Sequence, residues 1–169
     1  QDLWDDLLEL EQSHSHFLGS IVFVERNTKF DETDEYEIVD GQQRITTISI
    51  LLCALREYYK QKGDEDAANG IENDYLYEQN DDWNDEQKLE LNSLDQRQYS
   101  RLIEGNPPRE DESKIKRAIE FFADEIASLP EDQVEQIRKK LLNSVTLVTI
   151  NCPNQASAFR LFETLNDRG

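Results

Sequence analysis

A strand pattern that runs through one glycine into a long helical pattern constrains this chain most. Residues 36–47 read YEIVDGQQRITT, in which a short apolar strand ends at an acid and Gly41 follows. From Gln43 to about Lys62 apolar residues recur every three or four positions, which predicts a helix with one buried stripe. Glycine adopts the positive φ that a sharp bend requires, so the chain is expected to turn from sheet to helix at Gly41.

Other strand and helix patterns surround this corner. β-Branched and aromatic residues predict a strand at 17–25 that forms a hairpin with residues 36–40, and alternation predicts another strand at 144–151. Helical periodicity predicts further helices at 2–11, 94–103, 112–128, from Pro130 onward and in the last segment from Gln155.

The acidic, turn-rich segment 64–86 is expected to be an insertion or a mobile loop. Short strands are expected within it at Tyr75–Tyr77 and after it at residues 88–91. A contact with a partner protein is an alternative role for the acidic segment, although a solvated insertion is the simpler interpretation.

The charge of the chain limits the partners that it can have. Lys and Arg number 18 against 37 Asp and Glu, a net charge of -19, which repels a nucleic-acid backbone. No apolar run is long enough to cross a bilayer and no signal peptide is visible, so a cytoplasmic location is expected. Cys53 and Cys152 have neither metal-type nor disulfide spacing and are expected to be buried thiols.

The residues at the corner could bind a polyphosphate. Backbone N–H groups after Gly41 would point outward at a helix N-terminus, which attracts anions. Hydrogen bonds to a charged oxygen contribute about 1.5–3 kcal/mol each, more than the roughly 0.3–1 kcal/mol of the helix dipole. Arg44 could contact a phosphate, Asp40 suits Mg²⁺, a water or a ribose hydroxyl, and Thr46 could add a hydroxyl group.

An ordinary helix cap explains the same residues. Asp40 would then be the N-cap, Gln43 would close a capping box, and Arg44 would be solvated. The chain has neither the P-loop pattern nor the G-x-G-x-x-G dinucleotide fingerprint. Spacing alone therefore leaves both interpretations open.

Three motifs in order resemble a known family. They are FLGSIVF at 17–23, IVDGQQRITTISILLCAL at 38–55 and FRLFETLNDRG at 159–169. Over essentially the whole chain they resemble the N-terminal domain of the DGQQR-signature family, whose best-known members are GmrSD-type modification-dependent restriction enzymes. The resemblance implies a ParB/sulfiredoxin-like fold of class α+β, a small mixed sheet packed with helices, over residues 1–169, with a helical insertion at 64–143.

The resemblance also implies a function and a set of site residues. It implies nucleoside triphosphate binding, with the base unspecified, and Mg²⁺-dependent hydrolysis that regulates DNA cleavage in defence against phage. The implied catalytic residues are Asp40 and Arg44; the implied nucleotide-binding residues are Gly41, Gln42, Gln43, Thr46, Asn166 and Arg168; the implied metal ligands are Asp40 and Glu163.

The expected partners follow from the same resemblance. The chain is expected to be a piece of a longer protein whose C-terminal HNH-type nuclease domain contacts DNA, because His14 and His16, placed in a polar loop, build no such site. Self-association into a homo-oligomer stays open. A non-enzymatic sensor of a nucleotide or a partner protein is the alternative to an NTPase, and nuclease action by this chain itself is not expected at a net charge of -19.

Overall fold

A mixed three-stranded sheet organises the first of two units in the computed structural model of this chain. This unit comprises residues 1–44 and 135–169, and the second comprises residues 45–134. The structure describes residues 2–11, 14–26, 35–79, 83–92, 95–109 and 113–166, with side chains described as far as Thr164 in the last range.

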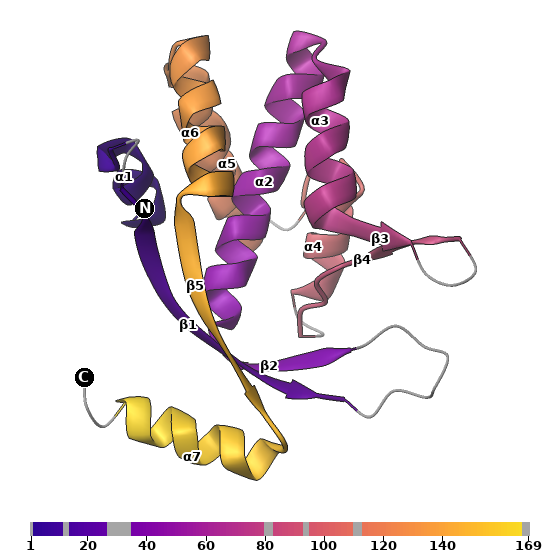
Figure 1. Cartoon of the computed structure of the whole chain (residues 1–169). Helices are drawn as coiled ribbons and strands as arrows, with labels where there is room; N and C mark the ends of the chain where they lie inside the picture. Colours follow the sequence, from indigo (N-terminus) through magenta and orange to yellow (C-terminus); the bar gives the residue numbers. More distant parts are fainter. Residues whose placement is uncertain are drawn as a thin grey trace. The chain divides into compact units, whose positions relative to one another are not determined.

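The central strand of the sheet pairs on both of its edges. Strand β2 (Tyr36–Asp40) runs antiparallel to β1 (His16–Glu25), and β5 (Val145–Cys152) runs parallel to β1 on the other side (Figure 1). The predicted hairpin and the third strand are therefore confirmed. Parallel and antiparallel pairing in one small sheet, together with the helices, also confirms the α+β class.

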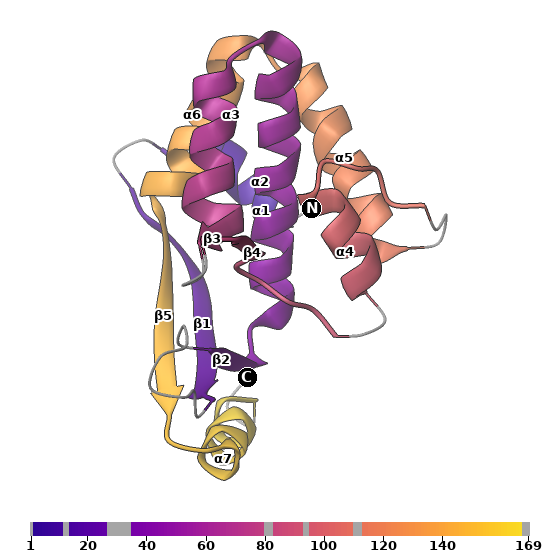
Figure 2. The ribbon, with the colours of Figure 1, turned by 90° about the vertical axis from the view of Figure 1, so that its right-hand side faces the viewer.

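Helix α7 (Gln155–Asn166) packs against the three strands of this sheet (Figure 2). Its first turn is capped by Asn154, whose Oδ1 accepts a hydrogen bond from the backbone N–H of Ser157 at 2.9 Å. Alternate strand residues point to one face, where they meet the helix. The cluster formed there consists of Val22, Val24, Val39, Ile150, Cys152, Ala158 and Leu161.

Helix α1 (Asp2–Glu9), which the sequence predicts, is held in the same unit by polar contacts at its end. Lys140 Nζ donates to the carbonyl of Leu7 at 2.9 Å, and so satisfies one of the last carbonyls of the helix. His16 Nε2 lies 3.1 Å from Asp6 Oδ2, and the histidine side chain is 27% exposed. The polar loop expected at His16 is thus wrong, because this residue already pairs in β1.

The acidic segment from residue 64, for which an insertion or a mobile loop is expected, begins as helix, so the mobile-loop alternative fails there. Helix α3 (Glu65–Ile71) is followed by the π-helix η1 (Glu72–Leu76). Asp64 Oδ1 accepts a hydrogen bond from Ala67 N at 3.0 Å, so this acid caps the helix. The loop prediction is wrong for residues 65–76 because acids in a first turn favour a helix there.

Two short strands follow this helical stretch. β3 (Tyr77–Gln79) pairs antiparallel with β4 (Asp85–Gln87), so the first strand begins at the end of the expected range Tyr75–Tyr77. The strand expected at residues 88–91 is wrong, since pairing ends at Gln87.

The remaining helices match their predicted positions. They are α4 (Gln96–Ile103), α5 (Lys114–Ser128) and α6 (Glu131–Asn143). That residues 64–143 form an insertion stays a prediction. Among the described residues, no helix has the length and apolar character needed to cross a membrane.

Helix α2 (Gln42–Lys62) is confirmed, but its burial is wider than one stripe. Every residue from Ser49 to Arg56 is buried. Polar side chains that would normally mark a solvent face find buried partners instead: the hydroxyls of Ser49 and Tyr99, for example, lie 2.6 Å apart. The one-stripe prediction is therefore wrong for these central turns.

The guanidinium of Arg56, 1% exposed, connects α2 to the end of α4. Its Nη1 donates to the carbonyl of Ile103 at 2.6 Å and its Nη2 to that of Leu102 at 2.9 Å. These are carbonyls of the last turn of α4, which have no partner inside the helix. Carboxylate oxygens of Glu57 and Glu72 lie 3.0 and 3.4 Å from the same guanidinium, so the buried charge is compensated.

Replacing Arg56 with leucine should lower the free energy of unfolding by about 3–5 kcal/mol, because the buried carbonyls of Leu102 and Ile103 lose their donor and two half-buried carboxylates lose their cation. Urea unfolding followed by circular dichroism measures the change. Glu57→Gln, at a partner whose side chain is 36% exposed, is the matched control and should cost under about 1 kcal/mol. Equal losses in the two variants would contradict the buried network.

Burial raises the pKa of the Cys53 thiol to about 12. The thiol is then protonated at pH 8 and unreactive toward iodoacetamide in the folded chain, since the thiolate is the nucleophile. In a Cys152→Ser background, labelling of Cys53 should rise with the unfolded fraction as urea is added. Mass spectrometry of labelled protein measures this, and rapid labelling without urea would contradict the burial.

Candidate functional site

The corner between β2 and α2 depends on the missing side chain of Gly41. Its φ of +89° lies in the region that side chains disfavour, and a Cβ built there would lie 3.0 Å from Ile21 Cγ1 and 3.0 Å from the carbonyl oxygen of Ser20. The backbone N–H of Arg44 donates to the carbonyl of Gly41 at 3.0 Å and starts the first turn of α2. Glycine is therefore required here for both conformation and space.

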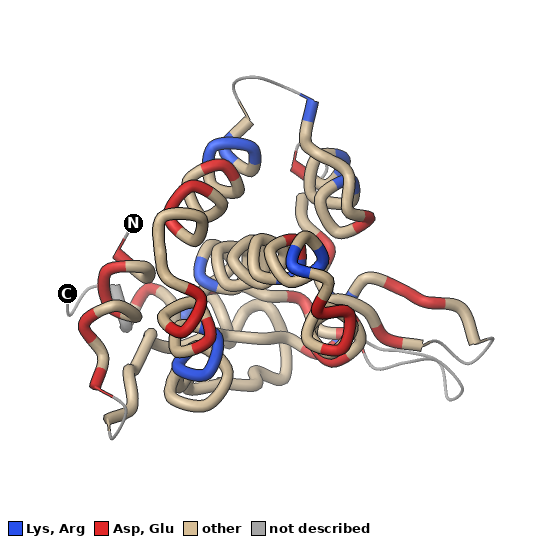
Figure 3. The backbone as a smooth tube through the Cα atoms, turned by 90° about the horizontal axis from the view of Figure 1, so that it is seen from above, with Lys and Arg blue, Asp and Glu red and all other residues tan. Residues whose placement is uncertain are grey.

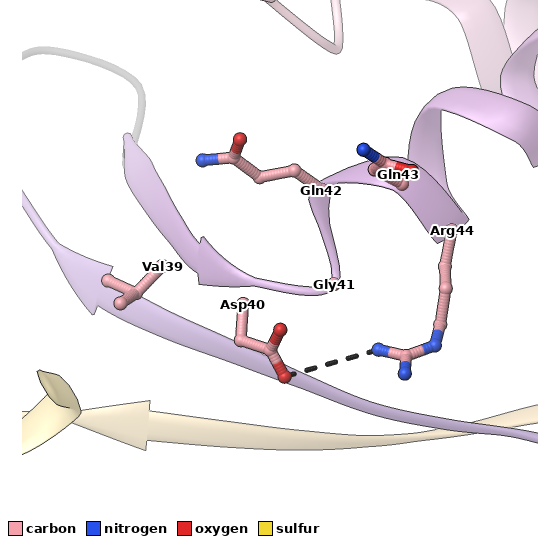
Figure 4. A pocket seen from close by; sticks show the side chains of 6 residues that line it. All are labelled: Val39, Asp40, Gly41, Gln42, Gln43 and Arg44. Carbon is pink, nitrogen blue, oxygen red and sulfur yellow. Dashed lines mark ion pairs between the residues drawn. The ribbon is translucent and has the colours of Figure 1, made fainter. Parts of the chain in front are cut away.

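Arg44 reaches from α2 back to the central strand. Its Nη1 donates to the carbonyl of Ser20 at 3.1 Å and lies 4.0 Å from Asp40 Oδ2. Figure 4 shows the guanidinium and the carboxylate on the same side of the bend. The arginine side chain is 44% exposed, and both contacts use Nη1 of a group with five N–H donors, so the cation can still bind an anion.

The two glutamines of the corner point to the other side of the bend (Figure 4). Gln42 Nε2 donates to the carbonyl of Ile38 at 2.6 Å, which ties the first helical residue to β2. The helix-cap alternative expects the Arg44 side chain to be solvated, whereas this side chain donates a hydrogen bond to β1. Both ends of the corner are thus anchored to the sheet.

An open hollow of about 460 Å³ lies at this corner. Its volume falls in the range of small-molecule sites. The structure brings together all five residues of the DGQQR sequence at this hollow. The lining residues are Val39, Asp40, Gly41, Gln42, Gln43 and Arg44.

Gly19 of β1, which is not among the predicted site residues, lies beside Arg44 at the same corner. Its φ is +108°, and a Cβ there would lie 3.2 Å from Arg44 Nε. The register of β1 against β5 shifts between Phe17 and Ser20, which places a bulge at this glycine. A glycine inside a strand pattern was the available signal, because it often marks a bulge or a close approach.

Two other predicted site residues, Thr46 and Glu163, are not among the described residues that line this hollow. Thr46 is half-buried on the next part of α2, and Glu163 is exposed on α7. Asn166 ends α7 with its side chain outside the described residues, and Arg168 lies outside them altogether. Within the described ranges, no three His, Cys, Asp or Glu side chains gather into a group that could hold a metal ion by itself. Closure of the site by the second motif stays a prediction.

Comparison with protein families gives a match over the whole chain. The family described as "GmrSD restriction endonuclease, N-terminal domain" matches residues 1–169, which is the whole chain. A comparison with curated proteins gives no match.

Gly41→Ala should lower the free energy of unfolding by about 2 kcal/mol. Alanine would have to adopt an unfavourable positive φ, and its Cβ would lie too close to the backbone of β1. The measurement is urea unfolding, with Gly70→Ala as the control. Gly70 lies in α3 with no atom within 4 Å of a built Cβ, so alanine there should leave stability unchanged or raise it by up to about 1 kcal/mol. A Gly41→Ala protein as stable as the original would contradict the close approach.

Proposed function

The chain belongs to the family of GmrSD restriction endonuclease N-terminal domains, and from this premise we propose that it binds a nucleoside triphosphate at the corner formed by residues 40–44. Binding and hydrolysis there would regulate a nuclease domain of the restriction enzyme. One observation carries the proposal: the five signature residues line one hollow at the start of a 21-residue helix, with Arg44 anchored beside it.

The phosphates would bind where the N-terminus of α2 and the guanidinium of Arg44 meet. The chain carries a net charge of -19, and Figure 3 shows Asp and Glu along helices of both units. Such a chain repels anions in general, so a phosphate needs a local cation and a helix N-terminus to bind. Arg44 supplies the cation among the residues that line the hollow.

Asp40 gives the corner one carboxylate for Mg²⁺. A magnesium ion on a nucleotide is usually held by one or two carboxylates, the phosphates and water, so Asp40 beside bound phosphates fits this chemistry. The ion would neutralise phosphate charge that Asp40 otherwise repels. Glu163, the second predicted ligand, is exposed on α7, so the fit rests on Asp40.

Hydrolysis would depend mostly on positioning. Arg44 would stabilise the charge that develops on the outer phosphate, and Asp40 would orient the attacking water. Gly41 allows the backbone to approach closely, and the contact of Gln42 with β2 holds the first turn in place. Asn166 and Arg168 would close the site from the second motif.

A non-enzymatic sensor is the second candidate, and one observation favours it. Asp40 is the single carboxylate among the residues that line the hollow, and the described part of the chain contains no cluster of three metal-binding side chains. A site with one carboxylate can bind a nucleotide and change a partner domain without turnover. Tight duplex DNA binding by this chain alone is not expected at its net charge.

Arg44→Ala should weaken binding of the preferred Mg²⁺–triphosphate about ten- to one-hundred-fold, the equivalent of losing one or two charged hydrogen bonds. Thermal shift with each of the four triphosphates identifies the preferred one, and calorimetry then gives its affinity. Arg26→Ala removes the same charge from an arginine paired with Glu35 and is the control, which should bind like the original protein.

Phosphate release by the same samples separates the two candidates. Turnover that Asp40→Asn abolishes supports the NTPase, whereas binding without turnover supports the sensor. If no triphosphate stabilises the protein, or if Arg44→Ala and Arg26→Ala bind equally well, the proposed site is wrong.

A further inference from the structure

We propose that Gly19 of β1 is a positioning residue for Arg44, and through Arg44 a determinant of how strongly the corner prefers a triphosphate to a diphosphate. The inference rests on the proposed nucleotide site and adds to it a selectivity element from a different strand. It makes the first motif of the chain, which contains Gly19, part of the same site as the DGQQR sequence.

The guanidinium of Arg44 occupies the space that a side chain on Gly19 would need. A Cβ on Gly19 would lie 3.2 Å from Arg44 Nε and 3.3 Å from Cζ, closer than atoms normally approach. One residue further along, the carbonyl of Ser20 accepts the hydrogen bond from Arg44 Nη1 at 3.1 Å. The bulged glycine therefore provides the space, and the next carbonyl provides the acceptor.

A side chain at Gly19 would displace the arginine more easily than the strand. The atoms that it would meet, Nε and Cζ, are at the far end of a flexible side chain, whereas the strand residues on either side of the bulge, Phe17 and Ser20, are held by pairing with β5. Arg44 is 44% exposed, so it has solvent into which it can move. Substitution at Gly19 should thus shift the cation away from the corner and break its hydrogen bond to Ser20.

The position of the cation matters most for the most highly charged ligand. A triphosphate carries more negative charge than the matching diphosphate, and the attraction falls with distance from the guanidinium. Moving Arg44 should therefore weaken triphosphate binding more than diphosphate binding. A general loss of structure would weaken both ligands alike, which makes the affinity ratio the informative quantity.

The test is a double-mutant cycle read out as the affinity ratio of Mg²⁺–triphosphate to Mg²⁺–diphosphate, measured by calorimetry for ATP, GTP, CTP and UTP and their diphosphates. Gly19→Ala should lower the ratio about fivefold, and Arg44→Ala about tenfold or more. In the Arg44→Ala background, Gly19→Ala should change the ratio less than about twofold, because its effect acts through the arginine.

Gly63→Ala is the matched control. Gly63 also has a positive φ, +77°, but a Cβ there meets no atom within 4 Å, so this variant has the backbone strain without the contact. Its ratio should equal that of the original protein. Gly19→Asn repeats the measurement if Gly19→Ala does not fold, because asparagine tolerates positive φ better than alanine.

The outcomes separate this inference from the proposed function. If the original protein binds triphosphate and Gly19→Ala keeps its ratio, the inference is wrong and the nucleotide site stands. If Gly19→Ala lowers the affinity ratio equally in the original protein and in the Arg44→Ala background, the inference is also wrong, since Gly19 would then act by another route. If the original protein binds no triphosphate, the proposed function fails and this inference fails with it.

Discussion

The close approach of the bend at Gly41 to the central strand is the constraint on which the candidate site depends. With no Cβ and a φ of +89°, Gly41 lets the backbone pass next to Ser20 and Ile21. Because the helix start lies this close to β1, the side chain of Arg44, one turn later, can reach the carbonyl of Ser20. A larger residue would hold the helix start away from β1, and the arginine would lose its acceptor.

The way in which Arg44 is held explains how a cation can act in so acidic a chain. Its hydrogen bond is to a neutral backbone carbonyl, and the carboxylate oxygen of Asp40 with which it pairs is 4.0 Å away. An ion pair at this distance and exposure is weak, so the guanidinium is positioned without being fully neutralised. Arg56 shows the opposite arrangement, since it is buried and compensated by carboxylates and carbonyls.

Elements of this chain that depend on short-range patterns are predictable from the sequence, whereas contacts between distant residues are not. Strands with clear alternation and helices with clear periodicity were predicted well, including the hairpin that leads to the corner. Residues 65–76 were mistaken for a loop because their acids suggested solvation, whereas Asp64 caps a helix. Burial of α2 was underestimated because Ser49 and Arg56 are polar, and their partners lie 50 and 47 residues away.

For the candidate site, the sequence alone specifies the bend, the acid, the arginine and the helix that follows, because these are consecutive residues whose conformation depends on local backbone preferences. A glycine in the strand pattern signals a bulge or a close approach at Gly19, but that Arg44 is the side chain approached, and that Ser20 is its acceptor, could be seen only in the folded chain. Ser20 and Arg44 are 24 residues apart, and they meet because β1 pairs with β2 and bulges beside the corner. Contacts of this kind depend on strand register and on the exact place of a bulge, which involve pairing partners far along the chain and are not set by the residues of the corner alone.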